Sequence, residues 1–105
     1  MKIENISWKE AAEKAEEENT VILDVRKERA FQKCHIQGAV CIPYYKLLKG
    51  EVKLPEGKCY LVYCERGNIS LLVTDELKKR GYEVMNILGG IQAFLSGQRN
   101  RLTNR

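Results

Sequence analysis

Four short apolar runs, each bounded by polar or turn-forming residues, divide the chain. They read TVILDV, GAVCIP, CYLVY and YEVMNIL and cover residues 20–25, 38–43, 59–63 and 82–88. Nearly unbroken apolar runs of this length, rich in Val and Ile, are typical of strands that are buried on both faces, as in a parallel sheet. The pattern therefore predicts four core strands.

Segments with apolar residues at helical spacing lie between these runs. Ser7 and Glu10 have the spacing of a capping box, which predicts a helix over 8–18. Further helices are predicted over 28–33, 44–49, 70–80 and 91–95. The alternation of strands and helices predicts an α/β fold, with a central parallel sheet of four to five strands and helices on both faces.

The carboxyl ends of the strands are the expected place for a ligand, because ligands bind there in parallel sheets. The chain segments at these ends are 24–26, 43–45, the residues from 64 onward, and 88–90. Only the third of them offers a nucleophile, Cys64.

Length and charge narrow the class of protein. A chain of 105 residues is enough for one domain, so we expect a single unit over 1–105. The net charge is +4, but cations and acids are intermixed over most of the length, which argues against a nucleic-acid-binding face. The exception is a basic tail over about 97–105, which we expect to be a solvated, fraying terminus.

The N-terminus has no apolar signal core, and no run approaches the ~20 apolar residues of a membrane span. We therefore expect a cytoplasmic protein without membrane contact, with Cys34, Cys41, Cys59 and Cys64 as free thiols. The spacing of these cysteines contains no CxxC pair, so neither a metal site nor another cofactor is expected.

Cys64 stands where a predicted buried strand meets the start of a helix. A helix N-terminus offers unpaired N–H groups and partial positive charge. Gly67 and Asn68 allow left-handed backbone angles, which can turn successive N–H groups inward as an anion nest. These features stabilise a thiolate or a persulfide anion. Arg66 adds a positive charge, which Glu65 opposes unless its side chain turns outward.

The other candidate nucleophiles and bases fit structural roles better. Cys41 and Cys59 are expected to pack in the core, and Cys34 to be inert in a loop. His35 precedes a predicted strand rather than following one, so we expect it at the opposite edge of the sheet from Cys64, in a structural role. The thiol then depends on backbone dipoles rather than on a general base.

The segments VILDVRKERAFQKCHIQGAVCIPY, LVYCERGNIS and GYEVMNILGGIQAF resemble the rhodanese-like domain family over about residues 6–94. Several separate motifs carry the resemblance in the right order, among them Asp24-Val25-Arg26, Ile42-Pro43, Cys64, Gly67-Asn68 and Gly89-Gly90-Ile91. The resemblance implies that Cys64 takes sulfane sulfur from a donor such as thiosulfate and becomes a persulfide. A thiol, or cyanide in the test tube, then removes the sulfur.

The resemblance also implies roles for individual residues. Backbone amides of the loop cradle the persulfide in this family, so substrate contacts are expected from Glu65, Arg66, Gly67, Asn68, Ile69 and Ser70. The Asp-Val-Arg positions mostly brace the fold, so Asp24 and Arg26 are expected at the site rim or as structural support. The expected partners are a small anionic sulfur donor, a thiol acceptor and a possible sulfur-relay protein.

Two loop positions bear on which sulfur donor and which type of function the chain has. Many active members have arginine where Ile69 stands, and this arginine helps to bind the sulfonate part of thiosulfate. The donor, thiosulfate or a protein persulfide, therefore stays open, as does a non-enzymatic module that carries sulfur or binds a partner. The phosphatase and arsenate-reducing branch has arginine six positions after the cysteine, where this chain has Ser70, which argues against phosphate chemistry.

Overall fold

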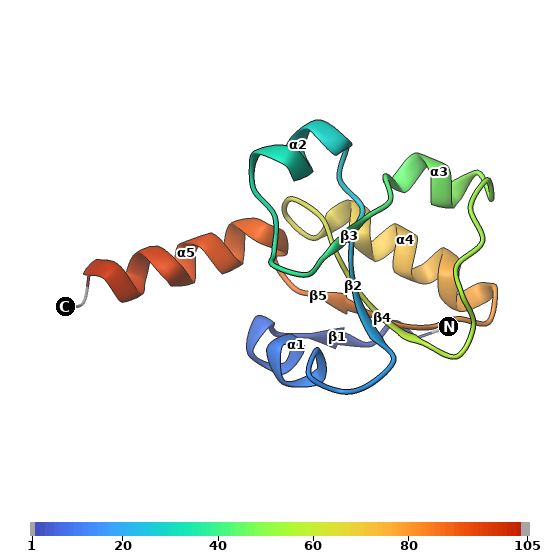
Figure 1. Cartoon of the computed structure of the whole chain (residues 1–105), viewed down its shortest axis with the longest axis horizontal. Helices are drawn as coiled ribbons and strands as arrows, with labels where there is room; N and C mark the ends of the chain where they lie inside the picture. Colours follow the sequence, from blue (N-terminus) through green and yellow to red (C-terminus); the bar gives the residue numbers. More distant parts are fainter. Residues whose placement is uncertain (1, 104–105) are drawn as a thin grey trace.

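A five-stranded sheet, parallel throughout, forms the centre of the computed structural model, which describes residues 2–103. The strands are β1 (Asn5–Ile6), β2 (Thr20–Asp24), β3 (Val40–Cys41), β4 (Cys59–Tyr63) and β5 (Glu83–Ile87). They lie in the order β1-β5-β4-β2-β3, so β4 is central (Figure 1). The predicted α/β fold around a parallel sheet is confirmed.

The central strand is anchored from both faces. Tyr60, Leu61, Val62 and Tyr63 are each at most 2% exposed. Because side chains alternate across a strand, Tyr60 and Val62 belong to one hydrophobic core. Leu61 and Tyr63 belong to the other. Burial of each such side chain contributes about 1.5–3 kcal/mol, so the strand that leads to Cys64 is held firmly.

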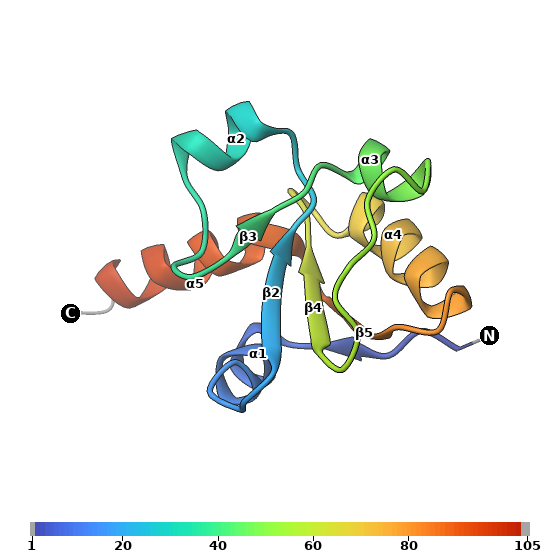
Figure 2. The ribbon, with the colours of Figure 1, turned by 45° about the vertical axis from the view of Figure 1, so that its right-hand side comes forward.

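The helices are α1 (Trp8–Lys14), α2 (Glu28–Lys33), α3 (Tyr44–Leu48), α4 (Asn68–Lys79) and α5 (Gly90–Thr103). Leu47 of α3 and Val73 of α4 pack in the same core as Val62. On the other face, Ile91 of α5 packs in the core that contains Leu61 and part of α1. The arrowheads of β2 and β4 point toward the end of the sheet where α2 lies (Figure 2). The helices therefore cover both faces, and α2 stands over the carboxyl ends.

The structure departs from the predictions mainly at the ends of elements. The first helix ends at Lys14 rather than near residue 18, and the chain turns through Asn19, whose φ is 64°, before β2. The predicted strand over 38–43 is reduced to Val40–Cys41, and α4 begins at Asn68 rather than 70. The additional strand, β1, pairs with β5 at the edge of the sheet.

The last helix is longer than predicted. It continues to Thr103, beyond the predicted 91–95, so the segment expected to fray from about 97 is helical up to that residue. The single Gly97 does not end it, because one glycine costs a helix only about 1 kcal/mol. Arg105, at the end of the basic tail, lies outside the described residues. Within 2–103, no helix has the length and apolar character needed to cross a membrane.

Candidate active site

Cys64 follows β4 directly and is only 4% exposed. The loop then turns through Gly67, whose φ of 103° is left-handed, and α4 begins at the next residue. The Sγ atom accepts hydrogen bonds from the N–H of Gly67, at 3.1 Å, and of Ser70, at 3.2 Å. Two N–H groups and the positive end of α4 thus converge on the sulfur, an arrangement that stabilises negative charge there.

A chain of polar groups runs from the sulfur through the buried Ser70 and Asn86 to the exposed Asn5 at the edge of the sheet. Ser70 Oγ lies 3.3 Å from Cys64 Sγ, and its hydroxyl donates to Asn86 Oδ1 at 2.6 Å. Asn86 Nδ2 donates in turn to Asn5 Oδ1 at 2.9 Å. The hydroxyl can turn its proton to the sulfur when the sulfur is charged. Asn86 and Asn5 were not predicted; the one signal was an amide side chain inside the apolar run over 82–88.

The Glu65 carboxylate is held by two partners beside the loop. Its Oε1 accepts from Arg26 Nη1 at 3.2 Å, and its Oε2 accepts from Gln92 Nε2 of α5. The hydrogen bond from Gln92 lowers the pKa of Glu65; burial opposes this shift and Arg26 adds to it. The negative charge of Glu65 is therefore compensated by Arg26, although the side chain stays in the wall of the site.

Asp24 and Arg26 form a buried ion pair under the rim. They are 0% and 8% exposed, and Arg26 Nη2 donates to Asp24 Oδ2 at 2.8 Å. The Tyr63 hydroxyl donates to the same oxygen at 2.5 Å, and burial together with this hydrogen bond raises the pKa of Tyr63. Asp24 therefore orients Arg26 and Tyr63, while Arg26 itself reaches the surface of the site.

A cleft of about 350 Å³ opens at Cys64. Its walls are formed by Val25, Arg26, Lys27, Ala30, Tyr44, Cys64, Glu65 and Ile69. Among the predicted loop residues, Glu65 and Ile69 thus line the cleft, whereas Gly67 and Ser70 contact the sulfur through their N–H groups. Arg66 and Asn68 are exposed and do not line the cleft in the part of the chain that the structure describes. The predicted loop is therefore brought together around Cys64 only in part.

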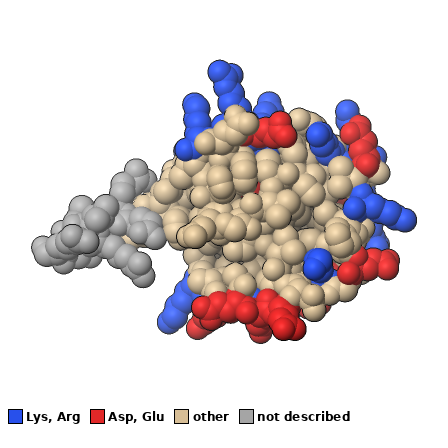
Figure 3. Space-filling view, viewed as in Figure 1, with Lys and Arg blue, Asp and Glu red and all other residues tan. Residues whose placement is uncertain are grey.

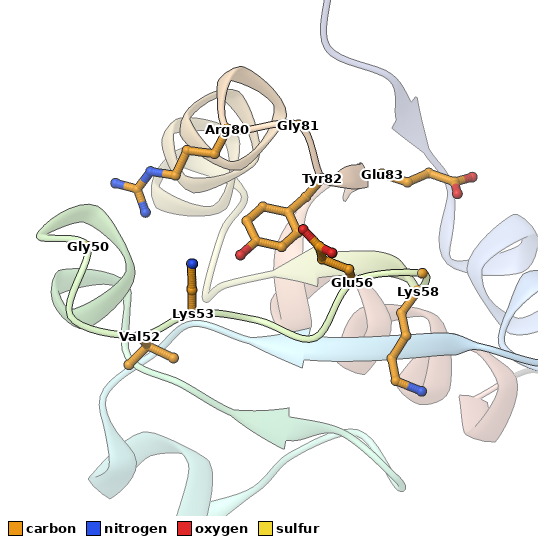
Figure 4. Close-up of a pocket in the computed structure, with 10 residues that line it drawn as sticks. Gly50, Val52, Lys53, Glu56, Lys58, Arg80, Gly81, Tyr82 and Glu83 are labelled. Atoms are coloured by element: carbon orange, nitrogen blue, oxygen red, sulfur yellow. The ribbon is translucent and has the colours of Figure 1, made fainter.

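A larger hollow, of about 600 Å³, lies at the opposite end of the sheet, around the amino ends of β4 and β5. Figure 4 shows Arg80 and Tyr82 among the residues that line it. Arg80 donates to Glu76 at 2.9 Å and to the Leu47 carbonyl at 2.8 Å, and the Tyr82 hydroxyl accepts from Leu54 N–H at 3.2 Å. Because these polar groups already tie α4 and β5 to the segment that contains α3, the hollow is a structural junction.

His35 has the structural role that was predicted, in a different place. Its Nδ1 lies 2.8 Å from the Phe31 carbonyl oxygen, and its ring stacks on the Phe31 ring. The predicted position at the opposite edge of the sheet is wrong. The next residue, Ile36, donates its N–H to the Tyr63 hydroxyl at the carboxyl end of β4. The physical reason is that β3 pairs only with the last two residues of β2, so the connection before β3 stays at that end.

The other three cysteines do not contact the sulfur of Cys64 among the described contacts. Cys41 and Cys59 are partly buried, and burial is the main cause that raises the pKa of both thiols. Cys34 is exposed. Over residues 2–103, no group of three or more His, Cys, Asp or Glu side chains is placed to hold a metal ion.

Known proteins resemble this chain in both sequence and structure. A family model described as Rhodanese-like domain matches residues 7–96. A thiosulfate sulfurtransferase GlpE of Coxiella burnetii is 33% identical over 95 residues, which cover 90% of this chain and 89% of the relative. A tRNA sulfurtransferase of Erwinia tasmaniensis is 33% identical over 99 residues, covering 79% of this chain and 20% of the relative, so this chain spans about a fifth of that protein. A rhodanese-related protein from Thermoplasma volcanium has a crystal structure that superposes with a TM-score of 0.80 at 26% identity, covering 90% of this chain and 92% of that one.

Proposed function

The chain belongs to the rhodanese-like domain family, whose model spans residues 7–96, and we propose that it is a sulfurtransferase that carries sulfur as a persulfide on Cys64. The observation that carries this proposal is the convergence of the Gly67 and Ser70 N–H groups on Sγ, at 3.1 and 3.2 Å. These donors would hold an anionic sulfur at the carboxyl end of β4. The names of the relatives, thiosulfate sulfurtransferase and tRNA sulfurtransferase, agree with the reaction class.

The proposed reaction consists of two displacements at sulfur. The Cys64 thiolate attacks the outer sulfur of the donor, a new S–S bond forms, and the old bond breaks with its electron pair on the leaving group, which is sulfite when the donor is thiosulfate. An acceptor thiolate, or cyanide in vitro, then attacks the outer sulfur of the persulfide, and Cys64 leaves as a thiolate. Neither step needs a further oxidant or reductant. The N–H groups stabilise the negative charge before and after each step.

The cleft favours a protein persulfide over thiosulfate as the better donor. Two cations line its wall: the charge of Arg26 is already compensated by Asp24 and Glu65, whereas Lys27 is exposed to solvent. Ile69 adds an apolar face that is 38% exposed. Among the lining residues a small dianion would meet one uncompensated cation, the solvent-exposed Lys27, whereas a donor protein would also cover Ile69. A reducing cytoplasm suits this chemistry, because it keeps thiols such as Cys64 free.

A non-enzymatic role as a sulfur carrier or a partner-binding module is the second candidate. The observation that favours it is apolar exposure beside the site: Leu72, one turn after Ile69 on α4, is 62% exposed. A phosphatase-like activity is not favoured. At the position where that chemistry needs an arginine, Ser70 is 0% exposed and hydrogen-bonded to Asn86.

Turnover assays separate these functions. The protein, its Cys64→Ser variant and a Cys34→Ser control are supplied with thiosulfate or with a cysteine-desulfurase system, and thiocyanate is measured after addition of cyanide. The proposal predicts turnover in the parent and the control and none in Cys64→Ser. If the protein takes up sulfur but forms no thiocyanate, the carrier role is favoured. If it takes up no sulfur and instead hydrolyses an added aryl phosphate, both the sulfurtransferase and the carrier role are contradicted.

A further inference from the structure

A groove between α2 and α5 adjoins the Cys64 cleft. It has a volume of about 490 Å³, and it shares four lining residues with the cleft: Arg26, Lys27, Ala30 and Glu65. From there it extends along α5 as far as Leu95. The groove is thus a surface that begins at the proposed sulfur-transfer site and leads away from it.

The floor and the rim of the groove differ in character. The half-buried Ala30 and Leu95 supply aliphatic surface from the two helices, and Ile91 lies buried beneath them. Lysine and arginine side chains supply the rim on the α2 side, and Figure 3 shows such side chains standing over α2. The groove therefore presents an apolar strip beside positive charge.

The cations of the rim are Lys27, Arg29 and Lys33, and all three side chains are exposed. Within residues 2–103 none of the three takes part in an ion pair. Two acids lie close by: Glu28 belongs to the same helix, and Glu65 is already held by Arg26 and Gln92. The rim thus keeps an excess of positive charge, which an acidic partner would complement.

We propose that this groove binds an acidic segment of a partner protein, which carries the cysteine that exchanges sulfur with Cys64. An apolar side chain of the segment lies on the floor between Ala30 and Leu95, and its carboxylates face the cations of α2. The binding follows from the groove itself, and the sulfur step rests on the proposed function.

The lining favours a peptide over other anions. A small anion such as thiosulfate would leave the aliphatic floor uncovered. Single-stranded nucleic acid is usually held by aromatic side chains on which bases stack, and the residues that line the groove include none. A peptide segment with both acidic and apolar side chains matches both surfaces.

The transfer step balances without a further reactant. The thiol of the segment loses its proton to water, and the thiolate attacks the outer sulfur of the Cys64 persulfide. The S–S bond to Cys64 breaks as the S–S bond to the segment forms, so the segment leaves as a persulfide and Cys64 regains its thiolate.

Binding is tested first, independently of sulfur loading. Two fluorescent peptides of equal length are compared, each with one leucine and with serine in place of cysteine, one rich in glutamate and the other in lysine. Fluorescence anisotropy with the Cys64→Ser protein is expected to show about tenfold tighter binding of the acidic peptide at low salt, since three exposed ion pairs together are worth roughly that factor. The preference should fade at about 1 M salt.

Charge-reversal variants locate the binding surface. The triple variant Lys27→Glu/Arg29→Glu/Lys33→Glu should abolish or invert the preference, and Arg29→Glu alone should reduce it. A matched triple variant, Lys9→Glu/Lys49→Glu/Lys53→Glu, changes the net charge by the same amount at exposed positions that do not line the groove. It should retain the preference for the acidic peptide. The proposal would be overturned if both peptides bound equally well or if both triple variants had equal effects. It would also be overturned if a single-stranded RNA oligonucleotide bound preferentially and the α2 variant abolished that binding.

Transfer is then measured with cysteine versions of the peptides and persulfide-loaded protein. The acidic peptide should accept sulfur about ten times faster than the basic one. If Cys64 takes up no sulfur, the proposed function fails while the binding result stands. If sulfur is transferred to both peptides at equal rates, the groove inference fails while the proposed function stands.

Discussion

Ile69 occupies the loop position at which the family resemblance implies an arginine, and it forms part of the cleft wall. Substituting Ile69→Arg adds a cation to the wall of the cleft, so we predict roughly tenfold faster turnover of thiosulfate, the effect of one hydrogen bond to a charged group. Steady-state thiocyanate formation measures it. Leu72→Arg, on an exposed position one turn further along α4, is the matched control and should leave the rate unchanged. An equal or lower rate in Ile69→Arg would show that the missing charge does not limit this donor.

Ser70 is the residue whose hydroxyl can follow the charge on the sulfur, because it lies 3.3 Å from Sγ and is anchored by Asn86. Ser70→Ala removes a hydrogen bond to a charged atom, so we predict about tenfold slower alkylation of Cys64 by iodoacetamide and slower sulfur transfer.

Thr74→Val is the control for this prediction. It removes another buried hydroxyl of α4, which donates to the Ser70 carbonyl and not to the sulfur. The midpoint temperature of thermal unfolding should fall in both variants, whereas the alkylation rate of Cys64 should fall only in Ser70→Ala. Equal alkylation rates in all three proteins would mean that Ser70 serves the fold alone.

At the scale of elements, the start of α5 braces the Cys64 loop. Ile91 N–H donates to the Cys64 carbonyl at 2.9 Å, and Gln92 N–H donates to the Glu65 carbonyl at 3.1 Å. Gly90 makes this approach possible, since its φ is +62° and a Cβ there would lie 2.4 Å from the Glu65 carbonyl oxygen. The loop that surrounds the sulfur is therefore shaped by two helices, α4 and α5.

Gly90→Ala should displace the loop and lower the free energy of unfolding by about 1–3 kcal/mol, with a loss of sulfur transfer. Gly97→Ala, in the same helix where a Cβ meets nothing within 4 Å, should instead stabilise the protein by about 0.5–1 kcal/mol and keep activity. Urea unfolding and thiocyanate assays on both variants check this. A Gly90→Ala protein as stable and active as the parent would contradict the bracing role.

The elements that could be predicted from sequence are those with a strong local signal. The run at 59–63 is apolar on both faces, and Gly67 marks the turn into α4, so β4 and the Cys64 loop were located correctly. β1 has only two residues, too few for a period to show, and the contacts of Asn86 depend on strand neighbours that no local pattern reveals. For the same reason the pairing of Glu65 with Gln92 could not be predicted.

At the scale of the whole molecule, the Glu65 carboxylate links the end of β4 to Arg26 after β2 and to Gln92 on α5. The pKa of Glu65 is lowered in the folded protein, mainly by Gln92 and also by Arg26. A lowered folded-state pKa contributes stability that is fully present above the unfolded value, about 4.3, and is lost as the pH falls through the folded value. The contacts of the Glu65 carboxylate with Gln92 and Arg26 should therefore stabilise the fold at neutral pH and not in acid.

Comparison with Glu65→Gln tests this dependence. The parent should be the more stable protein at pH 7, and the difference in free energy of unfolding should shrink as the pH is lowered through the acid range. Glu56→Gln, at an exposed position at the far end of the sheet, is the control and should show no such convergence. A difference that stays constant with pH would mean that Glu65 is not linked to folding through its charge.

The central claim is that Cys64, and no other cysteine, carries the sulfur. The most direct test is intact-mass analysis and peptide mapping after incubation with thiosulfate or with a cysteine-desulfurase system. The account predicts the mass of one added sulfur atom, located on the peptide that contains Cys64, removed by cyanide and absent in Cys64→Ser. Sulfur on Cys34, Cys41 or Cys59 instead, or no added sulfur in a folded protein with either donor, would contradict it.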